Sequence, residues 1–336
     1  MGLKEKIEKG RQVLVMRVAA KKAEKSVAKE EATTNTVENS QVKFSPSRQP
    51  MLILVCGETG VGKTYRNFQE FRKYLRGNPD MNRPGRKILV FDVNDDDYPQ
   101  FATVSPKHIH LLKSIRPRRI RPIKDDGRNM SIDEKREVVE LMVNEFREGL
   151  LVLEDLDKYM VGAKGQSVVG LLTTNRHNKL DIMISHQSIA KVTTTEWQNC
   201  TWLRLHHQVD DISRYESRIP NFFIVRIATY IVDEQYDLAN TAYSDGIIEE
   251  NEYKQRKSFF VYVNMRKLKI RGCSVNAFIR ACKKYVDSHG QRRIKQLMDE
   301  RDIQDKPIYK SRLSAMIKII GDLMRLYESS FVTVFE

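Results

Sequence analysis

The residues with the clearest chemical potential lie at 57–64, where the sequence reads Gly-Glu-Thr-Gly-Val-Gly-Lys-Thr. This spacing fits G-x-x-x-x-G-K-[ST], a pattern in which glycines let backbone N–H groups turn inward around phosphate oxygens. Lys63 would contact the terminal phosphates, and the Thr64 hydroxyl would hold a magnesium ion. The predicted nucleotide-binding residues are Gly57, Glu58, Thr59, Gly60, Val61, Gly62, Lys63 and Thr64.

The residues around this loop predict a strand before it and a helix after it. Leu52–Cys56 is an apolar run typical of a buried strand, and apolar residues recur at helical spacing over 63–76. The pattern requires this context, because the positive end of the helix then faces the bound anion. The context disfavours the other interpretation, a glycine turn that binds no ligand.

A second apolar run, 150–153, ends in Glu154-Asp155-Leu156-Asp157. Hydrolysis of a nucleotide requires a carboxylate near the metal and a group that positions the attacking water. We assign Glu154 to the magnesium shell together with Thr64, and Asp155 to the water, with Asp157 as a further candidate. Most such enzymes have Asp before Glu, so the motif can also be read one position later. Solvated acids at a strand end are the alternative interpretation.

A third polar position follows the apolar stretch 180–185, which ends at His186 and Gln187. Ligands of parallel sheets bind at the carboxyl ends of the strands, so Gln187 would lie near the nucleotide. A neutral amide at this place could sense the γ-phosphate or its water. His186 would face the opposite side of the strand, where we expect it to pack against other residues.

Strands and helices alternate along the middle of the chain. Strands are predicted at 51–57, 87–93, 150–153, 180–185 and 201–206, and the capping box of Ser131 and Glu134 opens a helix that ends before Gly149. This alternation predicts an α/β fold with a mainly parallel sheet and helices on both faces. Residues 101–130 are expected to be irregular, with an exposed basic loop at 116–121 between two prolines.

Four regions follow from composition. Residues 1–29 form a candidate basic amphipathic helix, residues 30–50 a polar linker, residues 51–272 the main α/β domain, and residues 273–336 a basic helical region. A hairpin is predicted from 258–263 and 267–270, followed by helices at 274–288 and 308–329. No run of about 18 apolar residues is present, so no membrane-spanning helix is predicted. The four cysteines lack C-x-x-C spacing, which disfavours zinc and favours reduced thiols in a cytoplasmic protein.

The positive charge of the chain is concentrated rather than evenly spread. The formal net charge of the 336 residues is +14, and residues 254–295 contain 13 lysines and arginines against a single acid, Asp287. Such a concentration indicates a polyanionic partner, nucleic acid first and an anionic membrane second. A solvated basic surface is the alternative.

A family resemblance rests on residues 176–187, which read Arg-His-Asn-Lys-Leu-Asp-Ile-Met-Ile-Ser-His-Gln. They resemble the arginine-to-glutamine segment of the FtsK–HerA superfamily of DNA-pumping ATPases, and most closely its viral genome-packaging members. The turn at 92–98 resembles the D-x-x-x-E-Y turn of the same superfamily. The likeness covers about residues 50–210, and Asn175 and the Glu-Asp order at 154–155 depart from the pattern.

The resemblance implies RecA-like subunits in a ring, usually a hexamer, that hydrolyse ATP with Mg²⁺ between neighbouring subunits. It implies an arginine that reaches the neighbour's nucleotide, and Arg176 is the first candidate, with Arg204, Arg214 and Arg218 as alternatives. It also implies DNA contacts that do not read sequence, from loops such as 116–124 and 158–165. The DNA-binding candidates are Lys158, Lys164, Arg256, Lys257, Arg266, Lys267, Lys269 and Arg271.

Three functions remain open on the sequence. The first is an ATP-driven DNA translocase, in particular a viral packaging motor in the host cytoplasm or the virion. The second is a motor of secretion, conjugation or filamentous-phage assembly, like the zonula-occludens-toxin group. The third is a slow nucleotide-dependent DNA-binding switch. Residues 1–29 could serve any of these by contacting DNA, a capsid, a membrane surface or a neighbouring subunit.

Overall fold

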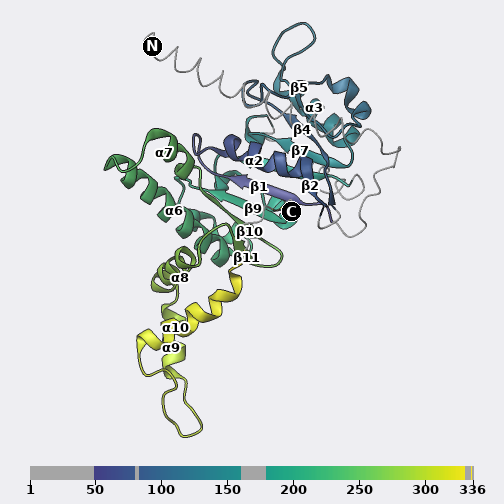
Figure 1. Ribbon diagram of the computed structural model, residues 1–336. Helices are drawn as coiled ribbons and strands as arrows, with labels where there is room; N and C mark the ends of the chain where they lie inside the picture. Colours follow the sequence, from purple (N-terminus) through teal and green to yellow (C-terminus); the bar gives the residue numbers. More distant parts are fainter. Residues whose placement is uncertain (1–48, 80–82, 160–178, 330–333, 335–336) are drawn as a thin grey trace.

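A mainly parallel sheet organises the molecule (Figure 1). The computed structural model describes residues 49–79, 83–159, 179–329 and 334, so the predicted helix at 1–29 and most of the predicted linker lie outside the described part. Within that part, nine strands pair in the order β11-β10-β9-β1-β8-β7-β4-β6-β5. Their bounds are β1 Leu52–Cys56, β4 Lys87–Phe91, β5 Ala102–Thr103, β6 Pro117–Ile120, β7 Gly149–Leu153, β8 Asp181–His186, β9 Trp202–His206, β10 Phe260–Asn264 and β11 Lys269–Arg271.

All pairings from β9 to β5 are parallel, whereas β10 runs antiparallel to both β9 and β11. The carboxyl ends of the parallel strands meet at one side of the sheet, which we call the carboxyl edge, and the opposite side is the amino edge. The predicted α/β fold with a mainly parallel sheet is confirmed. β1 lies between β8 and β9, and β8 separates it from β7, the apolar strand that Glu154 and Asp155 follow.

Two apolar layers cover the sheet. On one face, Ile53 and Val55 of β1 pack with Phe71 and Tyr74 of α2 (Lys63–Arg76). On the other face, the even-numbered residues of β1 join a larger core that includes residues of α3 (Ile132–Glu145), α6 (Phe222–Ser244) and α8 (Val275–His289). Burial on both faces explains why the central strands are continuous apolar runs.

The other α-helices among the described residues are α5 (Thr194–Asn199), α7 (Glu250–Lys257), α9 (Gln291–Asp299) and α10 (Arg312–Leu323). α9 and α10 lie beyond α8 (Figure 1), and the segment after α10 returns to the sheet, where Tyr327 bridges to Ile270 of β11. The predicted capping box of α3 is present, since Ser131 accepts from the Glu134 N–H and donates its own N–H to the Glu134 carboxylate at 2.7 Å. The predicted tail helix is shorter than expected, because α10 ends at Leu323 and a 3₁₀ turn, Met324–Leu326, follows.

The prediction that residues 101–130 are irregular is wrong. It contains β5, a 3₁₀ segment at Pro106–Leu111, and β6, which pairs with both β4 and β5. The basic run is thus partly a strand, and Arg119 is only 9% exposed. Pro117 is compatible with this position, because it is the first residue of its strand.

No helix in the described residues is long and apolar enough to cross a membrane.

Candidate functional site

The loop at 57–64 connects the carboxyl end of β1 to the first turn of α2. Gly60 and Gly62 have positive φ angles of 86° and 82°, a conformation that glycine adopts without strain. A Cβ atom on Gly62 would lie 2.7 Å from the Ser258 Cβ, and one on Gly57 would lie 2.6 Å from the His206 Cβ. Close packing and left-handed backbone both require glycine here. No side chain caps the first turn of α2, which leaves its N–H groups directed at the loop.

Lys63 lies within this loop. Its Nζ donates to the carbonyl oxygens of Gly57 at 2.6 Å and Glu58 at 2.8 Å. Burial lowers the pKa of the Lys63 ammonium, and the negative charges of Asp155 and Glu154 oppose that effect. Phosphate oxygens carry charge and are stronger hydrogen-bond acceptors than these carbonyls. The Lys63 ammonium can therefore exchange its bonds to the carbonyls for bonds to a bound phosphate.

Glu154 follows β7 and is 4% exposed. Its Oε1 accepts a hydrogen bond from the Asn67 Nδ2 of α2 at 2.7 Å and another from the Tyr98 hydroxyl. Burial raises the pKa of the Glu154 carboxyl. Asn67 is not among the predicted site residues, and Tyr98 is predicted only as the last residue of the 92–98 turn. The sequence signal for Asn67 is its place four residues, or one helical turn, after Lys63, because this spacing puts both residues on the same side of α2.

Asp155 lies beside Glu154 and has a left-handed backbone, with φ 45°. Its Oδ2 accepts from the Gln187 Nε2 at 3.2 Å and pairs with the Lys158 Nζ at 2.7 Å. The structure therefore brings together Asp155, which follows β7, and Gln187, which follows β8, as their positions at neighbouring strand ends require. Lys158, a predicted DNA ligand, instead contacts Asp155 and the Asn94 Oδ1.

His186 is buried behind the site, 3.3 Å from the carboxylate of Glu196, which agrees with a packing role rather than a catalytic one. Asp157 lies in the 3₁₀ turn Leu156–Lys158 that follows the two carboxylates.

The donor atoms at this edge suit magnesium. Thr64 lies in the first turn of α2, and Glu154 and Asp155 end the strand on the far side of β8. Hydroxyl and carboxylate oxygens are ligands that magnesium takes alongside water and substrate phosphates. Among the described residues there is no group of three or more acidic, histidine or cysteine side chains that could hold a metal. A magnesium ion here would accordingly depend on the nucleotide phosphates for part of its shell.

Arg204 was considered as an arginine that reaches a neighbouring subunit, and the structure contradicts that role. Its side chain is fully buried on β9, an interior strand, and its Nη2 donates to the Asn67 Oδ1. Arg214 and Arg218 are exposed. Arg218 donates to the carbonyl oxygens of Ala190 and Val192, at 3.2 and 3.1 Å. Arg176 and Lys164 lie outside the described residues.

The predicted DNA-binding residues of 256–271 do not form one surface. Arg256 and Lys257 precede β10, whose first residue, Phe260, pairs with His206 at the carboxyl edge. Arg266 and Lys267 follow Asn264, which pairs with Trp202 at the amino edge. The length of a five-residue strand, about 17 Å, separates the two groups.

Four of these basic residues are engaged within the chain. Arg256 pairs with Glu252 at 2.6 Å, and Lys269 donates to the Arg325 carbonyl oxygen. Arg271 pairs with Glu328 at 3.3 Å and lies 4.3 Å from the Trp202 ring. Lys257 lies over the rings of Tyr236 and Tyr253. Arg266 and Lys267 are exposed, and Lys269 is partly buried.

The pattern N-K-x-D, which reads guanine in GTP-binding proteins, occurs at 178–181. Asp181 begins β8 and so lies at the amino edge, away from the phosphate loop. Its buried carboxylate accepts from the Met51 N–H, the Tyr74 hydroxyl and the Arg86 Nη1, at 2.7–2.9 Å. Asp181 holds strands and helix together and cannot read a base bound at 57–64.

No protein-family model and no curated protein sequence matches the chain. Among solved structures it is similar to the genome packaging NTPase B204 of Sulfolobus turreted icosahedral virus 2 in complex with AMP. That alignment has 11% identity and a TM-score of 0.43, and it covers 66% of this chain and 96% of the other. The DNA-packaging ATPase B204 of Sulfolobus turreted icosahedral virus aligns at 12% identity and a TM-score of 0.42, over 67% of this chain and 97% of the other.

The N-terminal domain of zonular occludens toxin from Neisseria meningitidis aligns at 16% identity and a TM-score of 0.30. That alignment covers 49% of this chain and 80% of the other. Because these TM-scores are below 0.5, the description of the fold rests on the strand order and glycine loop of the chain itself.

Proposed function

We propose that the chain is an ATP-driven DNA translocase, and in particular a viral genome-packaging motor that hydrolyses ATP between the subunits of a ring. The observation that carries the proposal is that Lys63, Glu154, Asp155 and Gln187 follow the carboxyl ends of β1, β7 and β8, which are neighbours in one sheet. Phosphate binding needs the first of these residues, and hydrolysis needs the others. The resemblance of residues 176–187 to DNA-pumping ATPases indicates DNA as the polymer that the motor would move.

Each residue has a role in this proposal. The loop N–H groups and Lys63 hold the phosphates, and Thr64 and Glu154 contribute to the magnesium shell. Bound magnesium neutralises charge that develops on the phosphate oxygens. Asp155 orients the attacking water, and Gln187, which donates to Asp155, changes its contact when the γ-phosphate leaves. Such a change is how hydrolysis could be reported to the rest of the subunit.

A ring places the nucleotide of one subunit against its neighbour. Arg176 remains the first candidate for the arginine that completes the site in trans, with Arg214 and Arg218 as exposed alternatives. An arginine of this kind accelerates phosphoryl transfer by about 10³–10⁵ in related chemistry. The resemblance favours a hexamer.

The charge distribution supports a polyanionic partner. Acidic residues concentrate at the carboxyl edge, where Asp92, Asp95, Asp96 and Asp97 follow β4 and two more carboxylates follow β7. Exposed basic residues also lie at the amino edge: Arg76, Lys113, Arg147, Arg266 and Lys267. At the carboxyl edge, the exposed Lys158 and Arg256 are paired with Asp155 and Glu252. One acidic residue of the amino edge, Glu148, is paired with Lys179 there. Phosphate contacts of this kind give affinity without sequence preference, which a motor requires.

DNA is expected to stimulate ATP hydrolysis by the full chain several-fold, and raised salt is expected to reduce the effect. Charge reversal of Arg266 and Lys267 to glutamate should weaken DNA binding. It should also reduce the steepness of the plot of log binding constant against log salt concentration by about 2. The matched control reverses Arg312 and Lys318 on α10, which are also exposed, and should leave binding unchanged. A rate of ATP hydrolysis that neither single- nor double-stranded DNA changes would contradict the proposal.

The second candidate, a membrane-associated secretion or phage-assembly motor, is favoured by the basic amphipathic pattern predicted at 1–29. Flotation with anionic liposomes distinguishes it, because the full chain would float and a chain lacking residues 1–50 would not. The third candidate, a slow switch, predicts a monomer at high ATP and DNA concentrations and turnover that Arg176→Ala leaves unchanged.

A further inference from the structure

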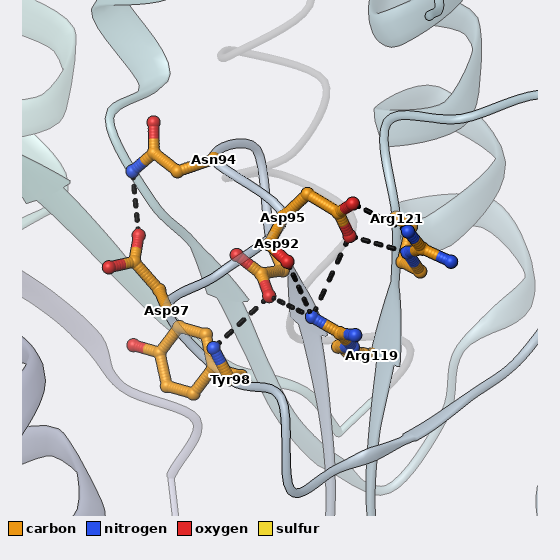
Figure 2. Close-up of polar contacts among 7 residues, drawn as sticks. All are labelled: Asp92, Asn94, Asp95, Asp97, Tyr98, Arg119 and Arg121. Carbon is orange, nitrogen blue, oxygen red and sulfur yellow. Dashed lines mark hydrogen bonds and ion pairs between the residues drawn. The ribbon is translucent and has the colours of Figure 1, made fainter. Parts of the chain in front are cut away.

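The loop after β4, residues 92–98, is held in place by two arginines of the neighbouring segment (Figure 2). The Asp92 Oδ2 accepts from the Arg119 Nη1 at 2.7 Å and from the Tyr98 N–H at 3.1 Å. Asp95 pairs with Arg121 through both carboxylate oxygens, at 2.5 and 2.6 Å. The 92–98 loop is thus fixed at its first residue and again in its middle.

One of these two ion pairs is buried, and the other is partly exposed. Asp92 is fully buried and Arg119 is 9% exposed, so their ion pair is shielded from solvent. The hydrogen bond from Arg121 lowers the pKa of the Asp95 carboxyl, which keeps that pair charged. The Asp92 N–H also donates to the Ile120 carbonyl oxygen at 3.0 Å. Bidentate arginine–carboxylate pairs fix geometry as well as charge, so the loop is expected to be rigid.

From this rigid loop, two side chains reach the carboxylates of the proposed hydrolytic centre. The Tyr98 hydroxyl donates to the Glu154 Oε1, and both residues are buried. At the other side of the loop, the Asn94 Oδ1 accepts from the Lys158 Nζ at 2.8 Å. The same Nζ is 2.7 Å from the Asp155 Oδ2. Asn94 is itself oriented by its bond to Asp97 at 2.6 Å (Figure 2).

We propose that the 92–98 loop is a positioning unit for both carboxylates, with Tyr98 fixing Glu154 directly and Asn94 fixing Asp155 through Lys158. This inference rests on the proposed function, because it gives the loop a part in the same ATPase site. Arg119 and Arg121, which the sequence suggested as DNA contacts, act here as internal supports of the loop. Neither they nor Tyr98 need to touch the nucleotide.

The physical reason concerns orientation. A buried carboxylate can turn about its side-chain torsions unless donors fix it, and Tyr98 and Asn67 both donate to one oxygen of Glu154. Residues that support a metal-binding carboxylate typically change metal affinity or activity by about 10–100-fold when they are removed. Tyr98→Phe deletes one hydroxyl and keeps the ring, which packs against Phe101 at 5.5 Å. The variant therefore tests the hydrogen bond rather than the core.

The test measures binding of a fluorescent ATP analogue to the full chain, in EDTA and over a series of Mg²⁺ concentrations. In Tyr98→Phe, the Mg²⁺ concentration that gives half of the magnesium-dependent gain in affinity should rise by about 10-fold. Affinity in EDTA should stay as in the wild type, because the phosphate loop is intact. Steady-state kinetics should show a lower kcat with a smaller change in KM at saturating Mg²⁺.

A second pair of variants tests the support of the loop. Arg121→Gln should shift the magnesium dependence in the same direction as Tyr98→Phe. Arg118→Gln is the matched control, since Arg118 lies on β6, three residues before Arg121, and directs its guanidinium to the Pro117 carbonyl oxygen at 3.0 Å. The control should behave as the wild type.

The two failures can be told apart. If wild-type affinity for the analogue does not respond to Mg²⁺, the proposed function fails. If the wild type responds and folded Tyr98→Phe responds identically, the positioning role of the loop is wrong while the ATPase proposal stands. Equal shifts in Arg121→Gln and Arg118→Gln would also overturn the positioning role, because they would reflect lost charge alone.

Discussion

Replacing Lys63 with alanine is expected to reduce ATP turnover by the full chain by at least about 100-fold, an effect typical of removing a group that stabilises transition-state charge. The Lys63 Nζ donates to carbonyl oxygens of the glycine loop itself, which places its charge where the phosphates would bind. Turnover should be measured by phosphate release at saturating Mg²⁺ and ATP.

The fold should survive this substitution. The two bonds of Lys63 are to carbonyl oxygens of its own loop, and its removal leaves no buried charge without a partner. Circular dichroism and thermal unfolding should therefore match the wild type. Lys73→Ala, in the last turn of the same helix, is the control and should keep normal turnover. Normal turnover in folded Lys63→Ala would remove the basis for a phosphate-binding role of the loop.

Asp155→Asn is expected to lower kcat by about 10²–10⁴ while nucleotide affinity changes little. The substitution keeps the shape of the side chain and its contact with Gln187, but removes the negative charge that would orient and polarise the attacking water. Single-turnover hydrolysis, together with binding of the fluorescent analogue, separates the loss of chemistry from a loss of binding.

Glu154→Gln is the companion variant, and it should act mainly through the magnesium dependence of binding. The carboxylates are adjacent in sequence but differ in surroundings, since Glu154 accepts from Asn67 and Tyr98 whereas Asp155 contacts Gln187 and Lys158. If Asp155→Asn keeps normal turnover and Glu154→Gln abolishes it, the two assigned roles are reversed.

Local patterns in the sequence predicted the elements that carry the site. The glycine loop, the first turn of α2 and the capping box of Ser131 depend on residues within a few positions of one another, and the structure has all three. The order of strands in the sheet is a different matter, because it depends on pairings between residues far apart in the chain. It decides that Arg204 is buried beside β1 and that Gln187 meets Asp155.

Contacts between residues far apart in the chain also explain why the predicted exposed basic loop at 116–121 is wrong. Arg119 and Arg121 lie in a proline-flanked run that is typical of an exposed loop, but their partners, Asp92 and Asp95, are more than twenty residues away. The reversal of β10 also divides a continuous basic stretch between the two edges of the sheet. Charge counted along a sequence does not show which side chains share a surface.

The most direct measurement for a DNA-translocating ATPase is release of streptavidin from biotin-labelled DNA, single- and double-stranded, by the full chain. The account predicts that ATP with Mg²⁺ accelerates release, whereas a non-hydrolysable ATP analogue, or Lys63→Ala with ATP, does not. ATP hydrolysis that DNA stimulates without any acceleration of release on either form of DNA would contradict a motor and favour a nucleotide-dependent DNA-binding switch.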